Sequence, residues 1–167
     1  MSTTKSSIKQ ITENLKEMQK ELQAVKAKFT ERATEEFTKA INQIFVEYPQ
    51  LETIAWTQYS PFFNDGEECT FGVHACTFSN APADEFNLWG KFNDKEDAKE
   101  KQYWAIGDEW YDNEDANAPE GLMDVHTQFD SILQSAEFED ILHEMFGNHV
   151  KVICTKTGID TESYDHD

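Results

Sequence analysis

The sequence predicts an α+β protein, in which a long N-terminal helix precedes a small antiparallel sheet of three or four strands packed on helices. Three observations support this fold class. Residues 3–48 contain no proline or glycine and are rich in helix-forming side chains. Residues 54–78 are dense in β-branched and aromatic side chains around an Asn-Asp-Gly turn. Residues 125–155 show helical periodicity and then strand-like alternation.

The N-terminal helical arm, residues 1–48, has a heptad pattern in its first half. Apolar side chains recur at alternating spacings of three and four residues, the a and d positions of a coiled coil. These seam residues are Ile8, Ile11, Leu15, Met18, Leu22, Val25 and Phe29. After Phe29 the stripe broadens to the 3.6-residue period that covers a globular core. We therefore expect homo-oligomerisation through the seam; the alternative is a helix that folds back on its own domain.

Pro49 ends the preceding helix. The segment 54–78 is expected to form a β-hairpin, because it is dense in β-branched and aromatic side chains and contains an Asn-Asp-Gly turn. Simple alternation along its second strand places His74 and Cys76 on one face and Cys69 on the other. Their shared face makes His74 and Cys76 the candidate metal ligands, with Cys154 as a third. Because no Cys-x-x-Cys or His-Glu-x-x-His spacing occurs, we predict no metal and no cofactor. Cys69 and Cys154 are expected to be buried as small core hydrophobes.

The hairpin also contains a distinctive string, which reads Trp56-Thr57-Gln58-Tyr59, Pro61, Phe63-Asn64-Asp65-Gly66 and Cys69-Thr70-Phe71. This string resembles a motif of small uncharacterised proteins of tailed bacteriophages. The likeness extends to a C-terminal strand and to the acidic tail at residues 164–167. It covers about a third of the chain and implies a phage or phage-like origin. Since that group has no assigned activity, the resemblance transfers no functional residue.

Charge is distributed unevenly along the chain. The net charge is −19, from 14 basic and 33 acidic side chains. Residues 1–48 are close to neutral, whereas the body, residues 49–167, holds six basic and 26 acidic side chains. Such a body repels nucleic-acid phosphates and attracts basic surfaces, including those of nucleic-acid-binding proteins. We therefore expect a basic protein partner and no direct nucleic-acid binding; the alternative is that the charge only confers solubility.

Residues 79–124 form an irregular insert in the acidic domain, with one short helix expected over residues 94–103. Within it, carboxylates alternate with aromatic rings and no basic side chain occurs between residues 108 and 120. The candidate partner-binding residues are Asp108, Glu109, Trp110, Tyr111, Asp112, Glu114 and Asp115, because aromatic anchors ringed by charge are typical of interfaces. The alternative is that the rings only pin a loop to the core.

The C-terminal part is expected to form one helix over residues 125–146, ended by Gly147. Residues 149–155 then alternate as a strand, and residues 159–164 are expected to form an edge strand after the turn at Gly158. No apolar run is long enough to span a bilayer, and residues 1–10 lack the apolar core of a signal peptide. The three cysteines are an odd number in a sequence without an export signal, so we expect their thiols to be reduced. We therefore expect a cytoplasmic protein without a membrane partner.

Catalytic signatures are missing from the sequence: there is no Gly-x-Ser-x-Gly, phosphate loop or dinucleotide fingerprint. We expect a non-enzymatic, phage-encoded acidic interaction protein that acts in the host cytoplasm. In its most specific form it mimics nucleic-acid charge and inhibits a defence or nucleic-acid-processing enzyme. The alternative is a small-molecule, nucleotide-binding or metal-dependent protein. Its site would lie near the hairpin and involve Trp56, Tyr59, His74 and Cys76.

Overall fold

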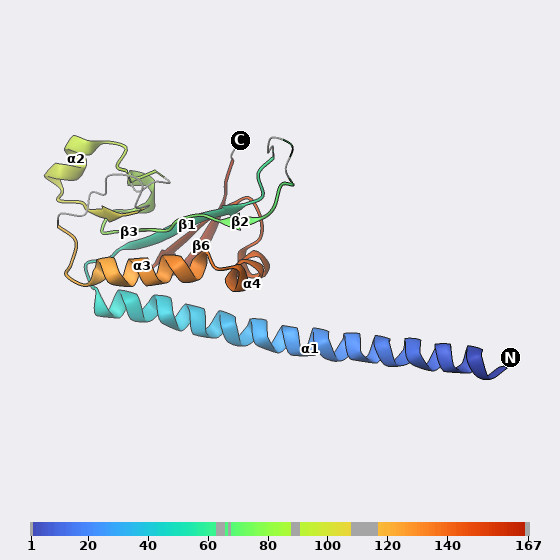
Figure 1. The fold of residues 1–167 in the computed structure, drawn as a ribbon. Helices are drawn as coiled ribbons and strands as arrows, with labels where there is room; N and C mark the ends of the chain where they lie inside the picture. The colour runs from blue at the N-terminus through green and yellow to red at the C-terminus, as the bar shows by residue number, and fades with distance from the viewer. Residues whose placement is uncertain (1, 63–65, 67, 88–90, 108–116, 166–167) are drawn as a thin grey trace. The chain divides into compact units, whose positions relative to one another are not determined.

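The computed structural model describes residues 2–62, 66, 68–87, 91–107 and 117–165. The chain divides into two compact units, a helical unit, Met1–Thr38, and an acidic unit, Lys39–Asp167. It combines a long N-terminal helix with an antiparallel sheet, which confirms the predicted fold class (Figure 1). None of the described helices has the length and apolar character needed to cross a membrane.

The helical unit consists of the greater part of one helix, α1 (Ser2–Glu47), which runs without a break into the acidic unit. Four threonine hydroxyls along it donate to the carbonyl oxygen four residues earlier, at 2.8–3.0 Å; they belong to Thr12, Thr30, Thr34 and Thr38. These bonds satisfy polar side chains within the helix itself. The helix ends just before Pro49, as predicted, after Tyr48 N–H donates to the Ile44 carbonyl at 3.0 Å.

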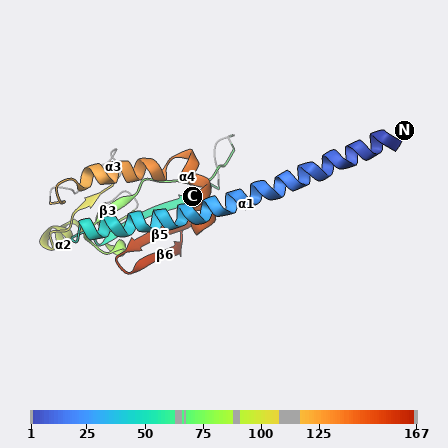
Figure 2. The same ribbon diagram turned by 90° about the horizontal axis from the view of Figure 1, so that it is seen from below.

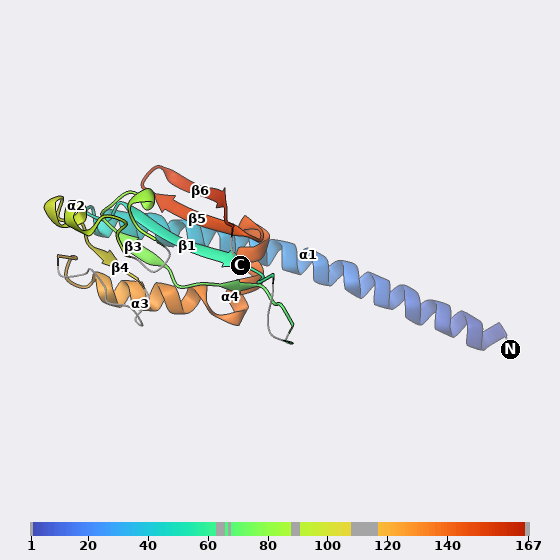
Figure 3. The same ribbon diagram turned by 90° about the horizontal axis from the view of Figure 1, so that it is seen from above.

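The sheet of the acidic unit has six strands and is antiparallel throughout (Figure 3). The strand order is β4-β3-β1-β5-β6, and β2 also pairs with β1. The sheet is larger than the predicted three or four strands, because the second hairpin strand is split in two and the insert adds one. The strands are β1 (Thr53–Tyr59), β2 (Gly72–Val73), β3 (Thr77–Ser79), β4 (Ala105–Ile106), β5 (Val150–Thr155) and β6 (Gly158–Ser163).

A β-bulge separates β2 from β3. Gln58 lies opposite Val73, whereas Ala55, three residues earlier on β1, lies opposite Thr77, four residues later on the other strand. The second strand therefore carries one extra residue, and such a slip reverses which face each side chain occupies. Cys76 is buried, whereas His74 is exposed. The prediction that His74 and Cys76 share a face is therefore wrong.

Helices cover one face of the sheet. α3 (Leu122–Leu133), α4 (Ala136–Phe146) and the end of α1 lie on this side, as Figures 1 and 2 show. The core between them includes Ile41, Phe45, Leu122, Phe129, Leu133, Ile54, Phe78 and Val152, all buried. The single helix predicted over residues 125–146 is in fact two helices. It breaks at Gln134 and Ser135, where the Ser135 hydroxyl donates to the Ile132 carbonyl at 2.7 Å.

A second layer covers the opposite face of the sheet. It contains the 3₁₀ turn η1 (Ala83–Glu85) and α2 (Lys95–Glu100), the latter within the short helix expected at residues 94–103. Its apolar side chains pack with residues of β1 and β4 into one buried cluster: Ala55, Ala81, Phe86, Phe92, Ala98 and Ala105. The described part of the insert therefore packs on the sheet. Because helices pack on the other face, β1 is buried on both faces.

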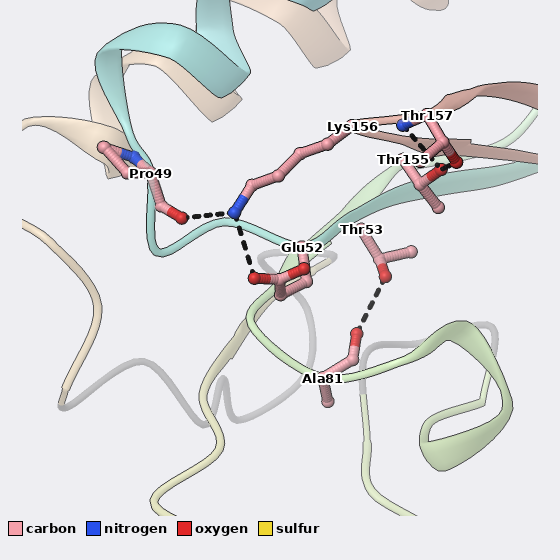
Figure 4. Close-up of polar contacts among 7 residues, drawn as sticks. All are labelled: Pro49, Glu52, Thr53, Ala81, Thr155, Lys156 and Thr157. Carbon is pink, nitrogen blue, oxygen red and sulfur yellow. Dashed lines mark hydrogen bonds and ion pairs between the residues drawn. The ribbon is translucent and has the colours of Figure 1, made fainter.

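The turn between β5 and β6 is fastened to the connection between α1 and β1 (Figure 4). Lys156 Nζ donates to the Pro49 carbonyl at 2.6 Å and to Glu52 Oε1 at 3.0 Å. Next to it, Thr53 Oγ1 donates to the Ala81 carbonyl at 2.8 Å and so joins β1 to the second layer. The exposed ion pair adds little stability by itself and joins the β5–β6 turn to the chain that follows the helix.

Candidate functional site

The predicted partner-binding residues lie outside the residues that the structure describes. They are Asp108, Glu109, Trp110, Tyr111, Asp112, Glu114 and Asp115. Elsewhere in the acidic unit, exposed carboxylates occur on α2, α4 and β6; they are Glu96, Glu100, Glu137, Asp140, Glu144, Asp160 and Glu162. Acidic side chains are therefore presented by several separate elements of the fold and are not confined to the insert.

The acidic unit contains far fewer basic side chains than acidic ones, so it can neutralise only part of its own negative charge. Residues 39–167 contain 27 of the 33 acidic side chains but only seven of the 14 basic ones. Ion pairs among the described residues include Lys101 with Asp97 at 2.9 Å and Lys156 with Glu52 at 3.0 Å. Even if every lysine neutralised one carboxylate, twenty would remain without a basic partner inside the unit. The acidic unit therefore carries a net charge of −20.

The seam residues lie on the helical unit and are open to solvent. Each of the seven apolar side chains is 56–68% exposed, although large apolar residues of this kind are normally buried. They are Ile8, Ile11, Leu15, Met18, Leu22, Val25 and Phe29. Since the described part of the helical unit is a single helix, it offers the seam no apolar partner of its own. A continuous exposed apolar stripe of this length is typical of an association surface.

The two candidate metal ligands are not brought together. The His74 ring is exposed and stacks on Tyr59 with centroids 4.2 Å apart, whereas Cys76 is fully buried. Among the described residues, no group of three histidine, cysteine or acidic side chains is arranged to hold a metal ion. Cys154 is buried as predicted, but Cys69 is exposed, which corrects the expectation that both are core residues.

Cys76, His126 and Asp130 form a group that superficially resembles catalytic machinery. His126 Nε2 lies 2.8 Å from the Cys76 carbonyl oxygen, and Cys76 N–H donates to Asp130 Oδ1 at 2.8 Å. Because a carbonyl can only accept, Nε2 carries the ring proton. Burial, and then the Asp130 carboxylate, raise the pKa of the Cys76 thiol well above its usual value. The thiol stays neutral and is therefore a poor nucleophile.

The alternative site at the hairpin does not form one cluster either. Trp56 is only 2% exposed and packs edge-on against Phe129 and Phe146, with centroids 6.3 and 5.9 Å apart. Tyr59 and His74, by contrast, reach the surface. The four residues proposed for a ligand site are therefore divided between the core and the exterior.

Three aromatic–histidine stacks in the acidic unit were not predicted from the sequence. Their ring centroids lie 4.2–4.8 Å apart; the pairs are Tyr59 with His74, Phe62 with His149, and Phe71 with His143. Two of the pairs join residues more than 70 positions apart, so no local pattern could have revealed them. Although its ring stacks on His149, Phe62 remains 65% exposed.

A cavity of about 390 Å³ lies on the second layer of the acidic unit. Its lining consists of Phe92, Lys95, Ala98, Lys99, Gln102, Tyr103 and Asn117. Gln102 has a left-handed backbone with φ of 57°, which is uncommon for a residue other than glycine. The two lysines alternate on α2 with Glu96, Asp97 and Glu100, so the helix carries no excess of positive charge. The charged side chains in the lining are therefore Lys95 and Lys99, on a helix whose other charged residues are acidic.

Comparison with known proteins places the chain in no group: no protein family, no curated protein and no solved structure matches it. The functional interpretation consequently depends on the acidic unit and the seam.

Proposed function

We propose that this chain is a non-enzymatic, phage-encoded interaction protein whose acidic unit binds a basic host protein. By occupying a surface that otherwise holds nucleic acid, it inhibits a defence or nucleic-acid-processing enzyme. The observation that carries the proposal is the charge of the acidic unit, in which at least twenty carboxylates have no basic side chain to neutralise them. The phage origin is part of the proposal and comes from the resemblance of the hairpin string.

Nucleic-acid-binding surfaces are built to receive closely spaced negative charges. Duplex DNA carries one negative charge per roughly 1.7 Å of its axis, and proteins meet it with lysine and arginine clusters. A protein surface dense in carboxylates offers the same sign of charge to such clusters, and complementary potentials accelerate association. Exposed carboxylates on α2, α4 and β6 support this role, since a basic partner would meet negative charge on each of these elements.

A binding role is also favoured over catalysis by the titratable groups that the fold brings together. The buried thiols are held neutral, and the Cys76, His126 and Asp130 group is occupied with backbone hydrogen bonds. These contacts stabilise the bulge rather than leave a nucleophile and a base free to act.

The seam gives the proposed protein a second property, homo-oligomerisation through α1. Joining several acidic units in one assembly raises the effective concentration of carboxylates at a partner surface. A basic partner with two or more binding clusters would then bind more tightly than one copy allows.

The test is affinity capture from host lysate followed by a quantitative assay with the captured partner. We expect a basic protein whose affinity falls steeply between 50 and 500 mM salt and which a DNA or RNA duplex displaces. An electrostatic interface loses orders of magnitude in affinity over such a range. Salt-insensitive binding, or a partner that nucleic acid does not displace, would refute charge mimicry.

Matched charge variants locate the surface. One variant neutralises the predicted cluster through Asp108→Asn, Glu109→Gln, Asp112→Asn, Glu114→Gln and Asp115→Asn. The control removes five charges elsewhere, through Glu96→Gln, Glu100→Gln, Glu137→Gln, Asp140→Asn and Asp160→Asn. If residues 108–115 form the interface, the first variant loses at least tenfold more affinity than the control. Equal losses would show that only the total charge matters.

A further inference from the structure

We infer that three or four copies of this chain associate through α1 in parallel and in register, with the seam residues at the centre of the bundle. This inference rests on the homo-oligomerisation included in the proposed function and adds the direction and number of the helices. The occupant of the exposed seam is thus further copies of the same chain. Three properties of the seam carry the inference: the count of its a and d positions, the charges beside it, and the residue types at a and d.

The heptad phase of the seam is unambiguous. A spacing of three leads from a to d, and a spacing of four leads from d to a. Ile8, Leu15, Leu22 and Phe29 are therefore a positions, and Ile11, Met18 and Val25 are d positions. The seam holds four a residues and three d residues.

This unequal count distinguishes parallel from antiparallel pairing. In parallel coiled coils a residues meet a residues and d residues meet d residues, so all seven layers are apolar. Antiparallel helices pair a with d, which leaves one a residue without an apolar partner. Two antiparallel registers pair all three d residues with a residues. The first leaves Phe29 unmatched. The second leaves Ile8 unmatched and places it opposite Arg32 of the other helix. Only parallel pairing buries the complete seam that the structure leaves exposed.

Charges flanking the seam favour the same direction. Glu21 occupies a g position and Lys26 the following e position, and parallel helices bring g of one chain beside e of the next. Every neighbouring pair in a parallel bundle therefore gains a Glu21 to Lys26 contact. The antiparallel register that leaves out Ile8 instead places Glu21 opposite Glu21 of the other copy. That like-charge pair opposes association.

The residue types at a and d indicate more than two helices. Parallel dimers prefer β-branched residues at a and leucine at d, whereas leucine at a with isoleucine at d shifts the preference to trimers and tetramers. Here the two central a residues are Leu15 and Leu22, and two of the three d residues, Ile11 and Val25, are β-branched. Thr12, Asn14 and Gln19 at e and g are uncharged, which suits the deeper burial of these positions in larger bundles.

Repulsion between the acidic units of neighbouring copies opposes a parallel arrangement. Dissolved salt screens this repulsion wherever solvent separates the charges. The Debye length is about 8 Å at physiological ionic strength. Salt weakens repulsion between charges that solvent separates, whereas it does not weaken the burial of the seam side chains.

Light scattering of the full-length protein at physiological salt tests the number of chains. We expect a mass three or four times the 19.3 kDa of one chain. The double variant Leu15→Asn/Leu22→Asn should be monomeric. The control Glu13→Gln/Lys20→Gln, on the opposite side of the helix, should keep the assembly. A monomer overturns the whole inference, and a dimer overturns the number of helices.

Disulfide cross-linking tests the direction, in a Cys69→Ser background that removes the exposed native thiol. Single variants Ile8→Cys, Leu15→Cys and Val25→Cys, with tags of different length, are mixed in pairs and mildly oxidised. Parallel, in-register helices link each variant only to itself, and Glu13→Cys on the outer face should not link. Cross-links from Val25→Cys to Ile8→Cys or Leu15→Cys would overturn the parallel direction. Partner binding is measured separately, so failure of the bundle and failure of charge mimicry are distinguishable.

Discussion

The indole Nε1 of Trp56 donates a hydrogen bond to Oε1 of Gln58, 3.1 Å away in the core. Gln58 is fully buried, and its Nε2 donates in turn to the carbonyl oxygens of Leu142 at 2.9 Å and Gly147 at 2.8 Å. One amide thereby joins β1 to the end of α4. Two residues of the string that resembles phage proteins thus have a structural role, in fixing a helix against the sheet.

Replacing Gln58 should therefore destabilise the acidic unit strongly. Gln58→Leu leaves the Trp56 N–H and two carbonyl groups without this partner, and each buried unsatisfied group costs about 1–3 kcal/mol. We expect a loss of at least about 3 kcal/mol in the free energy of unfolding, measured by urea denaturation. Gln128→Leu, at an exposed position of α3, should change it by less than about 0.5 kcal/mol. Similar losses from both would contradict this role.

Asp130 is expected to stabilise the bulge between β2 and β3. Its Oδ1 accepts from Cys76 N–H at 2.8 Å, and its Oδ2 accepts from Gln134 Nε2 at 2.8 Å. Asp130→Ala should cost about 1–3 kcal/mol, because the Cys76 N–H loses its acceptor. Asp130→Asn keeps a side-chain oxygen and should recover most of that loss. Chemical denaturation of both variants provides the measurement, and equal destabilisation would show that the acceptor is unimportant.

The two buried thiols should make the fold less stable in alkali. Burial raises the pKa of both Cys76 and Cys154 above the ordinary value of 9.0. Above about pH 9 the unfolded chain loses thiol protons that the native protein keeps, so the free energy of unfolding falls as pH rises. Each thiol contributes a slope of about 1.4 kcal/mol per pH unit.

The slope is measured by denaturation between pH 8 and 10. The double variant Cys76→Ala/Cys154→Ala should have a shallower pH dependence in this interval, whatever its stability at neutral pH. The control Cys69→Ala removes an exposed thiol and should keep the steep slope. An unchanged slope in the double variant would assign the alkaline effect to other groups.

Gly121 should not tolerate a side chain. Its backbone is left-handed, with φ of 84°, and a Cβ there would lie 3.1 Å from Tyr48 Oη. Gly121→Ala should lower stability by about 1–2 kcal/mol from the backbone conformation alone, with a further loss from the contact. In a Tyr48→Phe background the contact is relieved, so the same substitution should cost less. Thermal unfolding of the four proteins checks this, and identical losses in both backgrounds would exclude the steric part.

Local sequence patterns were sufficient for the elements with strong boundaries. Pro49 ends α1, and Gly147 separates α4 from the alternating strand β5. The position of the bulge could not be predicted, because the residues between Val73 and Thr77 keep an alternating pattern that fits a regular strand equally well. Which face His74 occupies is decided by pairing with β1, a contact between distant segments.

Contacts between distant segments determine the parts of the acidic unit that local sequence patterns did not predict. Phe86 and Phe92 lie in a segment without regular periodicity, and their burial depends on the sheet face beneath them. The break at Ser135 is similarly invisible to a helical pattern that continues on both sides. Of the candidate site, the seam residues were identified by spacing alone. The aromatic–histidine stacks were not, because they join distant parts of the chain.

The last strand, β6, ends the sheet, and its Asp160 and Glu162 are exposed. An edge strand offers unpaired backbone groups on which another strand can add, the first step toward fibre growth. An assembly of several copies would carry several such edges. Carboxylates on identical edges repel one another, so the charge proposed to attract a basic partner would also keep neighbouring copies from joining sheet to sheet.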